Sequence, residues 1–161
     1  VNGLKSQSQS RTGAQPPHEF LALGHLLDEM RLFKSNDELK LMQRAADISV
    51  EAHQAAMRAA RAGIREFELQ AELERVFRAH DAEAAYGSIV GAGANACVLH
   101  YRANNAAARA GDLVLIDAGA EYRNYAADIT RTFRKSASCS WPMCISGLPS
   151  PRRASYIISS L

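Results

Sequence analysis

A helical period of apolar and polar side chains begins just after Ser35. Ser35 to Glu38 have the form of a capping box, in which the Ser35 hydroxyl accepts from the Glu38 amide while the Glu38 carboxylate reaches back. Mainly small or apolar residues then recur three or four positions apart, at Leu39, Met42, Ala46, Ser49, His53, Ala56 and Ala60. This spacing predicts an amphipathic helix, and Gly63 lies where a left-handed residue would end it.

A second helical period covers Glu66 to about His80. Its apolar side chains fall on one side, at Leu69, Leu73, Val76 and Phe77. The pattern predicts a second helix, packed through this apolar side.

Strand signals follow the two helices. Residues 86–90 and 97–101 predict two short strands, the first of which ends at a Gly-Ala-Gly sequence. Residues 113–122 begin with a strongly apolar run, residues 123–124 can turn the chain, and residues 125–133 can return beside it. The predicted fold class is therefore α/β in the α+β sense, with two helices followed by a mainly antiparallel sheet.

Composition divides the chain into three zones. Residues 1–17 are polar and rich in Ser, Gly and Pro, which predicts a flexible arm. Residues 18–133 carry the patterned segments and form the predicted domain. Residues 134–161 contain eight serines and sustain no helical or strand period, so we expect a disordered tail there.

The bulk properties narrow the function classes. A hydrophobic content of 47% permits a packed core, and a net charge of +2 is too small to indicate a nucleic-acid or membrane partner. No stretch approaches the ~20 apolar residues that span a bilayer. The three cysteines do not describe a disulfide framework, so a cytoplasmic location is expected. A nucleotide-binding loop at residues 91–93 is rejected, because the third glycine and the phosphate-binding lysine are missing.

Two aspartates carry the chemical argument. If residues 123–124 form a two-residue hairpin loop, Asp117 faces Thr130, and Asp128 lies two positions away on the same face as Asp117. The two carboxylates are then diagonal neighbours, with Cα atoms roughly 7–8 Å apart. Two hard cations about 3.5–4 Å apart could be bridged by such a pair. A three-residue loop would instead place the carboxylates on opposite faces.

An alternative explanation needs no metal. Either aspartate could be solvated at a strand end or paired with Arg123 or Arg131. Without a cation, two close carboxylates would repel each other. Oxygen ligands favour Mg, Mn or similarly hard ions over zinc bound by thiolates.

Four segments together resemble one family. They are LDEMRLFKS at 27–35, YGSIVGAGAN at 86–95 with LHY at 99–101, GDLVLIDAG at 111–119, and YAADITRTF at 125–133. In this order and spacing they resemble the catalytic domain of bacterial Xaa-Pro aminopeptidase (aminopeptidase P), over roughly residues 18–133.

The resemblance implies a pita-bread fold, here in part, and a hydrolase that removes an N-terminal residue preceding proline. It implies a metalloprotease site in which two Mn²⁺ ions activate water. Asp117 and Asp128 would be metal ligands, with Asp128 bridging both ions, and His100 would be a catalytic residue that contacts the substrate. The implied partner is a peptide with proline at its second position.

The chain also departs from the family. The family's site has five protein ligands, and the remaining His and two Glu lie downstream, whereas residues 134–161 contain no Asp, Glu or His. We expect a product truncated or frameshifted after Phe133, inactive alone, weak in metal binding and prone to self-association through an exposed sheet edge. The alternatives are a prolidase-like dipeptidase fragment and a non-catalytic pita-bread binding module.

Overall fold

The computed structural model describes residues 22–134, so the predicted arm at 1–17 and nearly all of the predicted tail lie outside the described residues. Contacts divide the chain between Lys34 and Ser35. The first part contains helix α2 (Leu23–Leu32), which the sequence patterns did not predict and in which no residue is buried. No helix among the described residues is long and apolar enough to cross a membrane.

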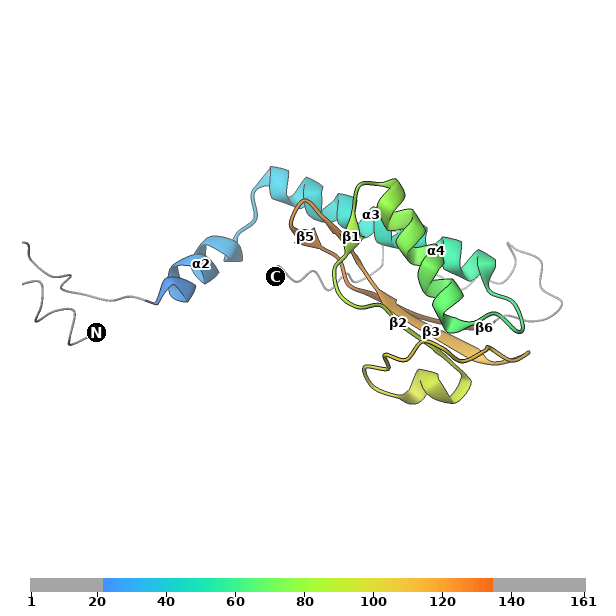
Figure 1. Ribbon diagram of the computed structural model, residues 1–161. Coiled ribbons are helices and arrows are strands. Elements are labelled where there is room, and N and C mark those ends of the chain that lie inside the picture. The colour runs from blue at the N-terminus through green and yellow to red at the C-terminus, as the bar shows by residue number, and fades with distance from the viewer. Residues whose placement is uncertain (1–21, 135–161) are drawn as a thin grey trace, which may run out of the picture. The chain divides into compact units, whose positions relative to one another are not determined.

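The second part begins with the two predicted helices, α3 (Asn36–Ala59) and α4 (Glu66–Ala79). The capping box is confirmed: the Glu38 amide donates to Ser35 Oγ at 3.3 Å, and the Ser35 amide donates to Glu38 Oε2 at 2.6 Å. Helix α3 ends before Gly63, which lies in the following turn with φ +84°. Figure 1 shows the two helices lying along the sheets.

Among the described residues, six short strands make two antiparallel sheets. One has the order β1-β4-β5, from β1 (Glu83–Ala84), β4 (Ala120–Tyr122) and β5 (Tyr125–Ala126). The other has the order β2-β3-β6, from β2 (Ile89–Ala92), β3 (Leu113–Ala118) and β6 (Ile129–Arg134). Helices followed by an antiparallel sheet are thus confirmed, while β2 begins and ends later than predicted.

The hairpin register is the one that a two-residue loop requires. Arg123 and Asn124 both have positive φ, 50° and 68°, as the two central residues of a type I′ turn do. Asp117 pairs with Thr130, as predicted. The predicted strand 113–122 is interrupted at Gly119, between β3 and β4. The backbone of Ala127 approaches so closely there that a Cβ would overlap its carbonyl oxygen, so the position requires glycine.

The predicted strand at residues 97–101 is wrong. A 3₁₀ helix, η1 (Gly93–Cys97), follows β2, and the next residues form turns. Hydrogen bonds to a buried carboxylate hold this segment, and sequence pattern does not reveal such contacts.

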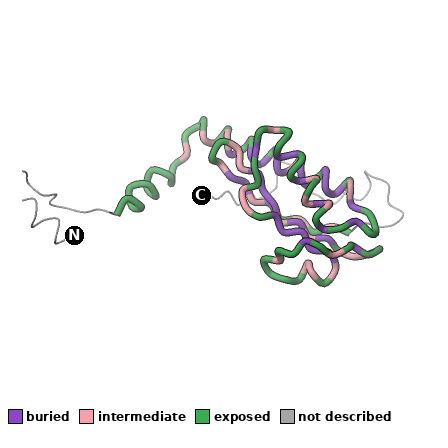
Figure 2. The backbone as a smooth tube through the Cα atoms, in the orientation of Figure 1, coloured by how far each residue is buried: buried purple, intermediate pink, exposed green. Residues whose placement is uncertain are grey.

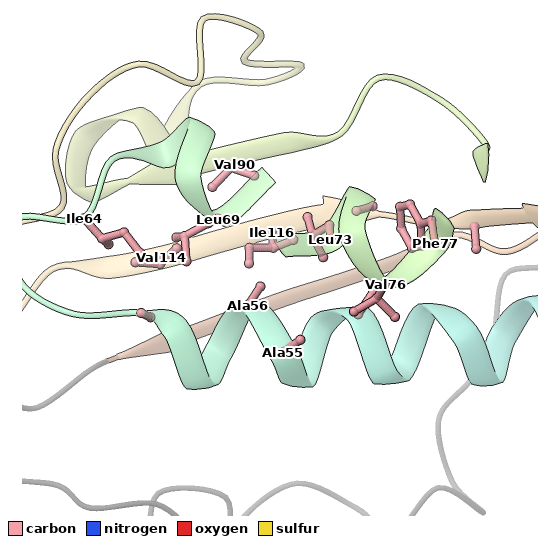
Figure 3. Packing of buried hydrophobic residues seen from close by; sticks show 14 of the residues in the cluster. Ala55, Ala56, Ile64, Leu69, Leu73, Val76, Phe77, Val90, Val114 and Ile116 are labelled. Carbon is pink, nitrogen blue, oxygen red and sulfur yellow. The ribbon is translucent and has the colours of Figure 1, made fainter. Parts of the chain in front are cut away.

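The core lies between the helices and one face of the sheets. Side chains of α4 pack against those of α3, β2 and β3, as Figure 3 shows for Leu73, Ala56, Val90 and Ile116. In β3, Val114, Ile116 and Ala118 are buried, and the alternate residues are less so. The tube in Figure 2 is accordingly purple along the inner helix faces and the central strands. The less buried face of β3, opposite the core, carries Asp117.

Candidate active site

A single phenol joins the two aspartates. The Tyr86 hydroxyl lies 2.7 Å from Asp117 Oδ1 and 2.9 Å from Asp128 Oδ1, so these two carboxylate oxygens converge on one point. The predicted placement of both carboxylates on one face of the ribbon is therefore confirmed. Asp117 lies on β3, and Asp128 comes just before β6, opposite Gly119.

The charge of this cluster is only partly balanced. Tyr86 has one hydroxyl proton, which can be donated to one carboxylate at a time. Neither Asp117 nor Asp128 belongs to an ion pair within the described part of the chain, so pairing with Arg123 or Arg131 is not observed. Burial, together with the hydrogen bonds to both carboxylates, raises the pKa of Tyr86 above its usual value. The phenol thus stays protonated and acts as a donor.

A pocket of about 330 Å³ lies beside Asp117. Its floor includes one row across the sheet, in which Ile89 of β2 pairs with Asp117 and Asp117 pairs with Thr130 of β6. Its wall is the segment 96–100, which ends in His100. The structure therefore brings His100 and Asp117 to the same pocket, with His100 exposed and its backbone at φ 53°.

Two side chains of helix α3 bond to the backbone where the chain passes from β3 to β4. The His53 ring Nε2 lies 3.0 Å from the Ala118 carbonyl oxygen, and the Ala120 amide donates to Ser49 Oγ at 2.8 Å. A carbonyl only accepts, so Nε2 carries the ring proton, and Nδ1 has no partner among the described residues. Burial is the main cause that lowers the pKa of His53. A neutral histidine and a serine thus hold the residues that follow Asp117.

The two carboxylates have the ligand chemistry that a divalent cation prefers, but they are fewer than the ligands of a complete metal site. Two carboxylate oxygens facing one point are the hard ligands that Mg²⁺ and Mn²⁺ prefer. Within residues 22–134, however, no group of three His, Cys, Asp or Glu side chains is placed to hold a metal ion. Asp117 and Asp128 are therefore the two candidate oxygen ligands in the described part of the chain.

Sequence patterns did not assign a role to three residues of this region. Tyr86 was recognised only within the segment at 86–95, and Ser49 and His53 only as members of a helix face. Each contacts a residue at least 31 positions away, and no local signal predicts such a contact.

Comparisons with known proteins show which family the chain resembles. The sequence model of Metallopeptidase family M24 matches residues 40–138. The Xaa-Pro aminopeptidase of Escherichia coli is 45% identical over 130 residues, which are 80% of this chain and 30% of that protein. The Xaa-Pro aminopeptidase of Haemophilus influenzae is 45% identical over 125 residues, 77% of this chain and 29% of that protein.

A solved structure of similar form is the Pseudomonas aeruginosa aminopeptidase PepP, with a TM-score of 0.77 and 54% identity over 84% of this chain and 30% of that one. The neighbours have the pita-bread fold, so the partial pita-bread prediction is confirmed. The chain spans about 30% of the length of the relatives that it matches. With the family model matching most of its length, the chain belongs to metallopeptidase family M24.

Proposed function

We propose that this chain is the part of an Xaa-Pro aminopeptidase that contributes two metal-binding carboxylates and one wall of the substrate pocket. The observation that carries the proposal is the convergence of Asp117 Oδ1 and Asp128 Oδ1 on the Tyr86 hydroxyl, beside a pocket that reaches His100. The names of the relatives, Xaa-Pro aminopeptidases, support the substrate class: peptides with proline at the second position. A cytoplasmic location is part of the proposal.

The roles divide between the two sides of the pocket. Asp117 and Asp128 would hold Mn²⁺, and Tyr86 would orient both carboxylates through its hydroxyl. Bound divalent ions of this kind polarise a substrate carbonyl and lower the pKa of water. His100 would contact the substrate from the pocket wall, and the exposed apolar side chains of Val98 and Leu99 beside it offer contact for an uncharged residue such as proline.

The number of ligands limits the affinity. Two carboxylates bind a divalent ion through few contacts, so the dissociation constant for Mn²⁺ should lie above about 10⁻⁴ M, the weak end of what oxygen-ligand sites show. A chain with these ligands should not hydrolyse an Xaa-Pro peptide unaided.

The test is a titration of the purified 161-residue chain with Mn²⁺, with free Mn²⁺ followed by electron paramagnetic resonance. Asp117→Asn and Asp128→Asn should each reduce binding. Asp47→Asn is the matched control, because Asp47 is an exposed aspartate on α3 whose hydrogen bond is to Gln43. Equal binding by all four proteins would refute the proposed ligands.

An activity assay separates the remaining possibilities. Incubation of the chain with Mn²⁺ and an Xaa-Pro peptide should release no N-terminal residue. Turnover would contradict the proposal that the site is incomplete. Absence of both Mn²⁺ binding and turnover, in a well-folded chain, would favour the non-catalytic binding module.

A further inference from the structure

The pocket wall has little regular structure of its own. Residues 93–106 form the first part of the connection from β2 to β3: the short helix η1, a turn at residues 98–100, and residues 101–106 without regular structure. Residues 96–100 of this connection line the pocket. In Figure 1 it is the yellow segment that lies below β2 and β3. Strand pairing does not hold residues 96–100 in place, so other contacts must.

One buried carboxylate bonds to residues on both sides of this wall. Glu66 is 0% exposed and accepts four hydrogen bonds. Its Oε1 accepts from the Ala92 amide at 2.8 Å and from Asn95 Nδ2 at 3.0 Å. Its Oε2 accepts from the Tyr101 hydroxyl at 2.9 Å and from the Ala106 amide at 2.9 Å.

The contacts enclose the pocket wall. The two amides belong to Ala92, the last residue of β2, and to Ala106. The two side chains belong to Asn95 and Tyr101, the residues immediately outside the wall segment 96–100. Asn95 Nδ2 also donates to the Tyr101 hydroxyl at 2.9 Å, which joins these two flanking residues directly. His100 is therefore bonded through the backbone to a residue, Tyr101, whose hydroxyl donates to Glu66.

A carboxylate suits this position better than any neutral side chain. An ionised carboxylate is an acceptor only and has about four lone-pair sites, which matches the four donors. Glu66 is the first residue of α4, where the helix dipole favours negative charge. The backbone is paired at the same place, since the Glu66 amide donates to the Ala106 carbonyl at 2.9 Å. No ion pair of the described residues involves Glu66, so these donors stabilise its charge.

We propose that Glu66 is a positioning residue for the active site: its carboxylate clamps residues 92–106 and holds His100 at the pocket beside Asp117. Glu66 does not touch the reacting atoms in this account. The part of the inference that concerns His100 rests on the proposed peptidase function, whereas the clamp itself does not.

Hydrogen exchange measured by mass spectrometry on the full chain tests the clamp without metal or peptide. Glu66→Gln keeps the shape of the side chain but leaves one oxygen acceptor for four donors. We expect exchange across residues 92–106 to accelerate about tenfold or more, while α3 and the β3–β6 pair keep their rates. Glu74→Gln is the matched control, because Glu74 is exposed on the same helix and bonded to Gln70. Unchanged rates in 92–106, or equal acceleration throughout the chain, would overturn the clamp.

Two further variants keep the test decisive if Glu66→Gln fails to fold. Tyr101→Phe and Asn95→Ala each remove one donor and leave the carboxylate in place. Each should accelerate exchange in the same segment by a smaller factor than Glu66→Gln. No acceleration in either variant would also overturn the clamp.

Nuclear magnetic resonance of the His100 ring tests the positioning role. Mn²⁺ is paramagnetic, so an ion held by Asp117 and Asp128 should broaden the His100 ring signals. Glu66→Gln should weaken this broadening while leaving the Mn²⁺ affinity unchanged. Equal broadening in both proteins would overturn the positioning role. If the unaltered chain binds no Mn²⁺, the proposed function fails, and the exchange result still decides the clamp.

Discussion

Replacing Tyr86 by phenylalanine removes the hydroxyl that two carboxylates share and leaves the ring in place. The lost contacts are 2.7 Å to Asp117 and 2.9 Å to Asp128. A hydrogen bond to a charged group contributes about 1.5–3 kcal/mol. Both aspartates are only partly buried, so water can solvate them after the change, and we expect the lower end, about 1.5 kcal/mol. For a domain of this size, that loss lowers Tm by roughly 6–12 °C.

The assay is thermal unfolding followed by circular dichroism, without metal and then with Mn²⁺. Tyr122→Phe is the matched control, since it removes the same atom from a partly buried tyrosine whose ring lies beside Arg123. Mn²⁺ should raise the Tm of both Tyr86→Phe and the unaltered chain, because an ion that binds the folded state stabilises it. Equal Tm values for Tyr86→Phe and Tyr122→Phe in the absence of metal would show that the Tyr86 hydroxyl does not stabilise the fold.

Three other predictions follow from the same structure. Because burial lowers the pKa of His53, the free energy of unfolding should fall as the pH drops below about 6.5, where the unfolded chain takes up a proton that the folded chain does not. The slope should reach up to about 1.4 kcal/mol per pH unit and should be smaller in His53→Gln. Urea unfolding at pH 7.5 and 5.5 measures both. Gly119→Ala should destabilise the fold by about 3 kcal/mol or more in the same assay, since its Cβ would overlap the Ala127 carbonyl. Gly24→Ala should not, because the nearest atom to its Cβ, Asp28 Oδ2, would lie 4.0 Å away. Strand β6 lies at the edge of its sheet, so we expect the chain to self-associate as its concentration rises in sedimentation velocity. Thr132→Lys on that strand should reduce the association. A chain that stays monomeric at all concentrations would contradict this expectation.

Local chemistry made part of the fold predictable. The capping box at Ser35 involves residues three positions apart, so its partners are visible in the sequence. The hairpin was equally accessible, because a two-residue loop at Arg123 and Asn124 fixes the pairing of every later residue. Since side chains alternate between faces, that register alone placed Asp117 and Asp128 on one side.

Contacts between distant segments were not predictable in this way. The residues of segment 97–101 suit a strand, but the segment forms no strand. Its Tyr101 hydroxyl instead donates to Glu66, which lies 35 positions earlier in the sequence. The role of Tyr86 likewise depends on carboxylates 31 and 42 positions away. Helix α2 was not predicted, and none of its residues is buried. Burial within the described structure therefore does not explain why this segment is helical.

The most direct test of the account is a crystal structure of this chain grown with Mn²⁺, with anomalous diffraction used to locate the ion. We expect one or more anomalous peaks within bonding distance of carboxylate oxygens of both Asp117 and Asp128. Peaks elsewhere, or two carboxylates that point away from each other with no ion between them, would contradict it.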